Sequence, residues 1–181
     1  MHRLFVALPP PPALADALLD VMEGLPGARW VDADNLHLTL RFIGEVDARR
    51  VDELALLLEG VAFAPFVLEL AGIGHFAHKG RPTALWAGVT ASAPLAALRL
   101  QVEHACRRAG LAGDGRRFVP HVTLARLGRD VGLLDRWLAT HGDLRTGPWP
   151  VASFALYESH LAPGGPSYET IASYPARDRP G

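Results

Sequence analysis

Histidine and threonine recur at one spacing in this sequence, in stretches that resemble β-strands. His37 is followed two residues later by Thr39, and Leu38 and Leu40 alternate with them. Residues i and i+2 of a strand point to the same face, so we expect His37 and Thr39 to project together. The two leucines should then point to the opposite face, into a hydrophobic core.

The same pattern returns in the second half of the chain. His121 and Thr123 alternate with Val122 and Leu124. Either copy alone has an ordinary interpretation, because a strand histidine beside a threonine is usually a core or surface residue making a simple hydrogen bond. Two copies in matching strand contexts favour a functional interpretation.

Two imidazoles that face each other suit in-line attack at phosphorus. One ring would deprotonate the nucleophile while the other protonates the leaving oxygen on the opposite side. Because the unperturbed pKa of histidine is about 6.5, one ring can be neutral and the other charged at neutral pH. The threonine hydroxyls could donate hydrogen bonds to the non-bridging phosphate oxygens. This chemistry requires neither a metal ion nor a cofactor.

Other catalytic patterns are absent from the sequence. It has no His-Glu-x-x-His, no Gly-x-Ser-x-Gly and no phosphate-binding loop ending in Gly-Lys. Cys106 falls on the apolar side of an expected helix, so we interpret it as a packed thiol rather than a nucleophile. His75 and His78 lie in an expected loop with no carboxylate close in sequence, and we expect no metal site there.

The composition is that of a globular protein. Hydrophobic residues make up 49% and charged residues 20% of 181 positions, and the formal net charge is −1. A net charge this close to zero excludes an overall positive potential that would attract nucleic acid to the whole surface. Any nucleic-acid ligand would therefore have to be bound by a few residues. Cys106 is the single cysteine, which excludes an internal disulfide. No segment has the length of a membrane span or a signal peptide, and we expect a soluble cytoplasmic protein.

Hydrophobic periodicity and turn residues predict an alternation of helices and strands. The prolines at positions 9–12 should form a rigid strand-to-helix connection, and Asp47 should be the N-cap of the helix that begins at Ala48. We expect helices at 13–23, 48–60, 94–109 and 131–140, strands at 4–8, 36–42, 65–70, 83–89, 120–126, 151–157 and 168–174, and a loop at 72–82. The Pro-Gly-Gly-Pro turn at 163–166 should join the last two strands as a hairpin.

Each half of the chain therefore contains a helix, a His-x-Thr strand, a second helix and two further strands. This order predicts an α+β fold with two pseudo-symmetric lobes, each an antiparallel sheet flanked by helices, and an active-site cleft between them. We expect residues 1–181 to form a single domain made of two intertwined lobes.

The sequence resembles the two-histidine (2H) phosphoesterases, and within them the bacterial and archaeal RNA 2′,3′-cyclic phosphodiesterases, also called 2′-5′ RNA ligases. The paired His-x-Thr-x motifs point to the superfamily. The resemblance covers nearly the whole chain, and its most characteristic segments are residues 4–9, 35–45, 72–76, 85–86, 120–126, 157–159 and 168–169.

This resemblance implies hydrolysis of RNA 2′,3′-cyclic phosphate ends to 2′-phosphomonoesters. It implies that His37 is the proton donor to the leaving 3′ oxygen and that His121 activates the water, with Thr39 and Thr123 holding the phosphate. It further implies a phosphate contact by Arg126, five residues after the second histidine. Phe42 holds the matching position after the first histidine and is a candidate for stacking on a nucleobase.

The alternation of side chains along a regular strand conflicts with the assignments of Phe42 and Arg126. The spacing of five is odd, so on a regular strand Phe42 and Arg126 would face away from the histidines, and only a bulge or twist would turn them back. A core position for Phe42 therefore stays open. Arg41 should share the face of His37 on a regular strand, where it would touch phosphate or be solvated.

Three functions follow as hypotheses. The first is a metal-independent RNA 2′,3′-cyclic phosphodiesterase acting as a monomer. The second is a 2′-5′ RNA ligase that joins tRNA halves by the reverse chemistry, with a 5′-hydroxyl as nucleophile. The third is a nucleotide- or RNA-binding module that has kept the site without turnover.

Overall fold

The computed structural model describes residues 1–177 and shows an α+β fold built on one antiparallel sheet. The elements in chain order are β1 (His2–Leu8), α1 (Pro12–Leu19), β2 (Ala28–Trp30), the 3-10 helix η1 (Ala33–Asn35), β3 (Leu38–Val46), α2 (Ala48–Glu59), β4 (Phe66–His78), β5 (Arg81–Val89), α3 (Ala93–Arg108), β6 (His121–Leu127), α4 (Leu134–His141), β7 (Arg145–Val151), β8 (Ser153–Ala162) and β9 (Gly165–Pro175). The sheet order is β7-β4-β5-β6-β3-β1-β8-β9, and β2 pairs with β6.

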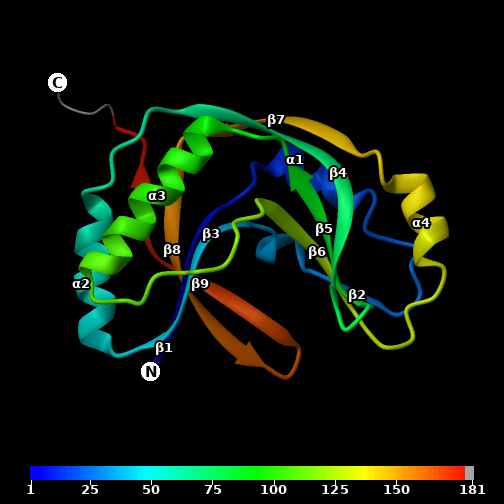
Figure 1. Ribbon diagram of the computed structural model, residues 1–181, viewed down its shortest axis with the longest axis horizontal. Coiled ribbons are helices and arrows are strands. Elements are labelled where there is room, and N and C mark those ends of the chain that lie inside the picture. The colour runs from blue at the N-terminus through cyan, green and yellow to red at the C-terminus, as the bar shows by residue number, and fades with distance from the viewer. Residues whose placement is uncertain (178–181) are drawn as a thin grey trace.

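The sheet divides into two lobes at the boundary between β6 and β3. One lobe contains β3, β1, β8 and β9, with α2 and α3 packed together on it. The other contains β6, β5, β4 and β7, with α1 packed on β7 and α4 on β4. Figure 1 shows α2 and α3 on one flank and α4 on the opposite flank. The predicted fold class is thereby confirmed.

The two halves of the chain exchange strands between the lobes. The first half supplies β4 and β5 to the lobe of β6, and the second half supplies β8 and β9 to the lobe of β1. The last two strands form the predicted hairpin, with Ala162 opposite Gly165. Figure 1 shows the end of this hairpin projecting between the two flanks.

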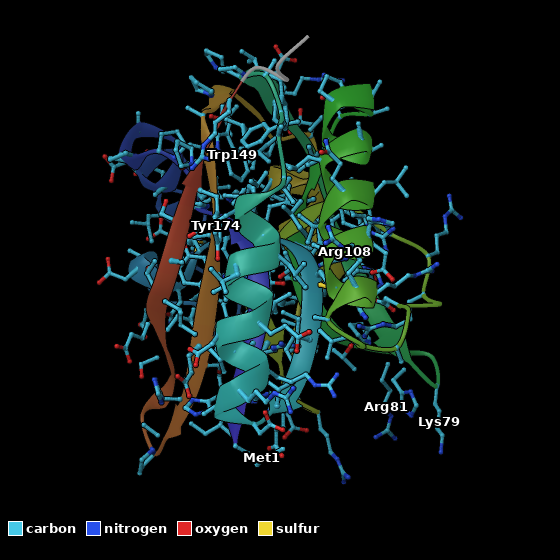
Figure 2. All side chains as sticks on the ribbon, turned by 90° about the vertical axis from the view of Figure 1, so that its left-hand side faces the viewer. Met1, Lys79, Arg81, Arg108, Trp149 and Tyr174 are labelled. Carbon is cyan, nitrogen blue, oxygen red and sulfur yellow. The ribbon has the colours of Figure 1, made fainter. Side chains whose placement is uncertain are left out.

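Local signals explain where the helices begin. Pro11 and Pro12 occupy the N-cap and first position of α1, where proline's missing N–H costs nothing. The carboxylate of Asp47 accepts a hydrogen bond from the Arg50 amide at 2.9 Å, which caps α2 as predicted. Leu54 and Leu58 then point from α2 into the core. Figure 2 looks onto this flank, with α2 in front and α3 beside it.

The predicted loop at 72–82 was wrong, because β4 continues to His78 and pairs with β5 along this length. The glycines of this segment do not mark a loop, because Gly74 lies against a neighbouring side chain and Gly72 lies at an irregularity of the strand. A Cβ on Gly74 would lie 2.5 Å from the ring of Trp86, and Gly72 has a φ of +80° where the register shifts. Lys79 and Arg81 lie at the turn of this hairpin and point away from the body of the molecule (Figure 2).

Two strands, β7 and β2, were not predicted. Strand β7 contains Pro148 and Pro150, residues that argue against a strand in the interior of a sheet. Since β7 is an edge strand beside β4, the missing N–H groups can face away from the ladder. Strand β2 has only three residues and is held by its pairing with β6. None of the helices within residues 1–177 is long and apolar enough to cross a membrane.

Candidate active site

The two His-x-Thr motifs meet at the boundary between the lobes. Leu38 of β3 pairs antiparallel with Val122 of β6, and both side chains are fully buried. Each of these residues follows the histidine of its motif, so the pair lies on a local two-fold axis that relates the motifs. Antiparallel pairing brings each histidine towards the threonine of the other motif.

Both imidazole rings are oriented by the same backbone contact. Nδ1 of His37 lies 2.7 Å from the carbonyl oxygen of Asn35, and Nδ1 of His121 lies 2.5 Å from that of Val119. A carbonyl oxygen can only accept, so Nδ1 carries the proton in each ring and donates it. Nε2 is therefore left in each ring for a ligand.

A bulge interrupts β3 directly after its motif. Ala7 of β1 pairs with Thr39, but the preceding residue Val6 pairs with Arg41, so Leu40 is an extra residue. Side-chain alternation shifts by one at this point. Phe42, five residues after His37, therefore returns to the histidine's face.

A bulge occurs at the equivalent position of β6. Trp86 of β5 pairs with Thr123, whereas its neighbour Leu85 pairs with Ala125, so Leu124 is the extra residue. Leu124 and Ala125 are both fully buried in succession, and Arg126 then faces outward. The paired bulges remove the parity conflict at both +5 positions.

The expectation for Arg41 was wrong, because the bulge at Leu40 turns its side chain away from His37. Arg41 is buried, with Nε 2.9 Å from Oε2 of Glu103 and Nη1 3.4 Å from Oδ2 of Asp114. Nη2 also donates to the carbonyl of Ala112. Arg41 thus ties β3 to α3 and to the segment that leads into the second motif.

All six predicted site residues line one cleft of about 1060 Å³: His37, Thr39, Phe42, His121, Thr123 and Arg126. Phe42 is 37% exposed, which contradicts a core position. The guanidinium of Arg3 lies 5.4 Å from the centre of the Phe42 ring. The end of the β8–β9 hairpin forms another wall, and the Asn35 side-chain amide donates to the carbonyl of Pro166 at 2.7 Å.

Burial lowers the pKa of both histidines below the ordinary value of 6.5. For His37, the nearby charges of His121 and Arg126 lower the pKa further, while the hydrogen bond to Asn35 opposes the change. For His121, the hydrogen bond to Val119 opposes the effect of burial, and Arg126 again lowers the pKa. Burial and the Arg126 charge therefore favour neutral rings in the free protein.

Aromatic side chains surround each histidine. The ring of His37 lies 4.8 Å from that of Phe5 and meets Tyr168 edge-on at 5.3 Å. The ring of His121 meets Phe76 edge-on at 4.9 Å. These contacts restrict the rings and account for the burial that lowers their pKa values.

Sequence reasoning assigned no role to Phe5, Phe76 or Tyr168, although all three line the cleft. Aromatic residues are common in strands, so their type alone did not mark them. Only the strand register shows that they adjoin the histidines. By contrast, Cys106 is a fully buried thiol as predicted, and burial raises its pKa to about 11.

Comparison with known sequences identifies the family. The profile of the 2′-5′ RNA ligase superfamily matches residues 10–162, a range that contains both His-x-Thr motifs. The chain belongs to this superfamily. An RNA 2′,3′-cyclic phosphodiesterase of Aeropyrum pernix is 37% identical over 146 residues, which cover 79% of this chain and 83% of the relative. The resemblance to two-histidine phosphoesterases is confirmed.

Solved structures of other proteins share this fold. The crystal structure of a Thermus thermophilus protein has a TM-score of 0.82 at 28% identity, covering 97% of this chain and 98% of that one. E. coli LigT complexed with 3′-AMP has a TM-score of 0.80 at 27% identity, covering 97% of this chain and 98% of that one. The likeness extends over both lobes.

Proposed function

We propose that this member of the 2′-5′ RNA ligase superfamily hydrolyses RNA 2′,3′-cyclic phosphate ends to 2′-phosphomonoesters without a metal ion. The observation that carries the proposal is the pairing of the two motifs about Leu38 and Val122, with both rings held by Nδ1 and both lining one cleft. The relative of Aeropyrum pernix named as this enzyme supports the choice of reaction.

The mechanism uses the two rings on opposite sides of the phosphorus. Nε2 of neutral His121 takes a proton from water as its oxygen bonds to phosphorus. The bond between phosphorus and the 3′ oxygen breaks, and Nε2 of protonated His37 gives its proton to that oxygen. The 2′ ester remains, so the product is a 2′-phosphomonoester. Thr39, Thr123 and Arg126 would stabilise the charge on the non-bridging oxygens.

The free protein does not favour the protonation state that this division of roles requires. The reaction needs one proton on the pair, whereas burial favours two neutral rings. The negative charge of a bound phosphate favours the protonated ring, so substrate itself supplies part of the driving force for charging His37. For the free protein we expect a bell-shaped dependence of kcat/KM on pH, with its maximum below pH 6.5.

The aromatic wall of the cleft provides a place for the terminal nucleoside. Phe42 projects from β3, lines the same cleft as the proposed acid His37, and is partly exposed. Stacking on a base is worth about 1–3 kcal/mol in proteins that bind single strands. We assign Phe42 to the terminal base.

One chain supplies both histidines, which supports a single-domain monomer, and we place its action on RNA in the cytoplasm.

The test is to incubate the pure protein, after treatment with a chelator, with an oligonucleotide ending in a 2′,3′-cyclic phosphate. We expect a 2′-phosphate end and unchanged turnover after chelation. A 3′-phosphate product, or loss of turnover that an added metal restores, would contradict the proposal.

The ligase activity for which the superfamily is named is the second candidate. The same assay distinguishes ligation from hydrolysis. Adding an RNA with a 5′-hydroxyl end should leave hydrolysis as the main outcome. A joined 2′-5′ product as the main outcome would favour the ligase. Binding without any product over long incubation would favour the non-catalytic module.

A further inference from the structure

The cleft is strongly cationic although the whole chain has a formal net charge of −1. Two aspartates and six arginines line it: Asp32, Asp114, Arg3, Arg29, Arg99, Arg116, Arg117 and Arg126. Asp114 is already engaged, because Arg116 contacts its carboxylate through Nε at 3.0 Å and Nη2 at 3.2 Å. The cleft therefore carries more positive charge than one reacting phosphate monoanion requires.

Two of these arginines are direct neighbours across a strand pair. Arg29 of β2 pairs antiparallel with Arg126 of β6, and both line the cleft. Directly opposed residues of an antiparallel pair point to the same face, with Cβ atoms about 5 Å apart. On its other side Arg126 pairs with Ala84 of β5, whose methyl group leaves the guanidinium accessible.

Like charges in directly opposed positions destabilise a sheet. Within residues 1–177, neither Arg29 nor Arg126 forms a salt bridge, and Asp32 forms none with either. The repulsion between the two guanidinium groups is therefore not offset by an acidic side chain in the described part of the chain. An anion bound in the cleft would offset it.

The two arginines occupy different places relative to the histidines. Arg126 lowers the pKa of both His37 and His121, whereas Arg29 is not among the charges that affect either ring. Arg29 lies on β2, which pairs with β6 at residues 125–127, beyond the point where β3 pairs with β6 at Val122. Its backbone is held there, because Val31 donates to the carbonyl of Leu124 at 2.8 Å and Trp30 packs against Trp137.

We propose that Arg29 forms a second phosphate subsite, which binds the phosphodiester joining the terminal nucleotide to its 5′ neighbour. Arg126 would hold the reacting phosphate and Arg29 the next one along the strand. This assignment rests on the proposed function. It makes the preferred substrate an oligonucleotide rather than a cyclic mononucleotide, with the strand leaving the cleft over β2.

The experiment compares two substrates, a 2′,3′-cyclic mononucleotide with one phosphate and a dinucleotide with the same cyclic end and one internal phosphodiester. For the wild type we expect a higher kcat/KM on the dinucleotide. Arg29→Gln should lower kcat/KM about tenfold on the dinucleotide, the size of one charge-assisted hydrogen bond, and less than twofold on the mononucleotide. The dependence of log kcat/KM on log salt should become shallower by about 0.7 on the dinucleotide alone.

Arg145→Gln is the matched control, because Arg145 is also an exposed strand arginine but lies on β7 outside the cleft. It should leave both substrates unchanged. Without RNA, the Arg29→Gln variant should melt at the wild-type temperature or above, since the substitution removes the like-charge pair.

Equal losses of Arg29→Gln on both substrates would overturn the subsite and place Arg29 on the reacting phosphate. No loss on either substrate would overturn it as well. If the wild type hydrolyses neither substrate, the proposed function fails separately. Titration of the wild type and of Arg29→Gln with an uncyclised dinucleotide then tests the subsite. Weaker binding by the variant would support the subsite, and equal binding would refute it.

Discussion

The two histidines are matched in geometry and differ in surroundings. Each donates from Nδ1 to the carbonyl two residues earlier, which leaves Nε2 for the substrate. Both pKa values are lowered mainly by burial, and Arg126 contributes to both. His37 also experiences the charge of His121. Because the roles of acid and base depend on which ring holds the proton, the charges around the pair should set the pH range of activity.

Arg126→Gln should therefore shift the pH profile as well as reduce the rate. Arg126 disfavours protonation of both rings, so removing its charge should raise both apparent pKa values and move the maximum of kcat/KM to higher pH. Burial remains, so the maximum should stay on the acidic side of the ordinary histidine value. Loss of the phosphate contact should also reduce kcat/KM by about 10- to 100-fold.

The measurement is kcat/KM against pH for wild type and variant, with Arg145→Gln as a charge-matched control outside the cleft. A maximum that stays in place or moves to lower pH would show that Arg126 does not act on the pair.

At the scale of elements, two bulges decide which side chains reach the cleft. The extra residues Leu40 and Leu124 occupy the same position after each histidine. They return Phe42 and Arg126 to the histidine face and bury Arg41 on the other face. Arg41 then contacts Glu103 of α3 and Asp114, which lies in the segment before His121. One buried cation thus connects the first motif to the approach of the second.

Arg41→Met should destabilise the protein strongly, because it leaves the buried carboxylate of Glu103 with only the Arg107 side chain and the Asp114 backbone amide as partners. Removing one member of a buried ion pair costs about 3–5 kcal/mol, and the remaining Arg107 contact favours the lower end. The melting temperature should fall by roughly 6–12 °C. Arg49→Met, an exposed substitution on α2, serves as the control. A thermal melt that changes no more for Arg41→Met than for Arg49→Met would contradict this role.

At the scale of the whole molecule, the exchange of strands joins the lobes. Strands β4 and β5 come from the first half of the chain but complete the lobe of β6, and β8 and β9 return to the lobe of β1. The cleft is lined from both lobes, so its walls depend on contacts between residues distant in sequence.

Local sequence patterns were sufficient to predict the two site strands and the start of α2, but not the positions of the bulges or strand β7. The alternation around His37 and His121 predicted both site strands, and the Asp47 cap predicted the start of α2. A bulge or twist was named as the condition for the two +5 assignments, but the position of the bulges was not predictable, because the apolar pair Leu124 and Ala125 is equally compatible with a regular strand. Strand β7 was missed because its prolines are tolerated only at an edge, and position in the sheet is a long-range property.

His37 and His121 act together on one phosphate in the proposed mechanism, and a double-mutant cycle is the sharpest test of this coupling. The measurement is kcat on an oligonucleotide with a 2′,3′-cyclic phosphate end for wild type, His37→Ala, His121→Ala and the double variant. Each single variant should lose about 10²- to 10⁴-fold, the usual contribution of general acid–base catalysis. Because the rings act as a unit, the double variant should be no slower than the slower single variant. Wild-type turnover by either single variant, or losses that multiply in the double variant, would contradict the account.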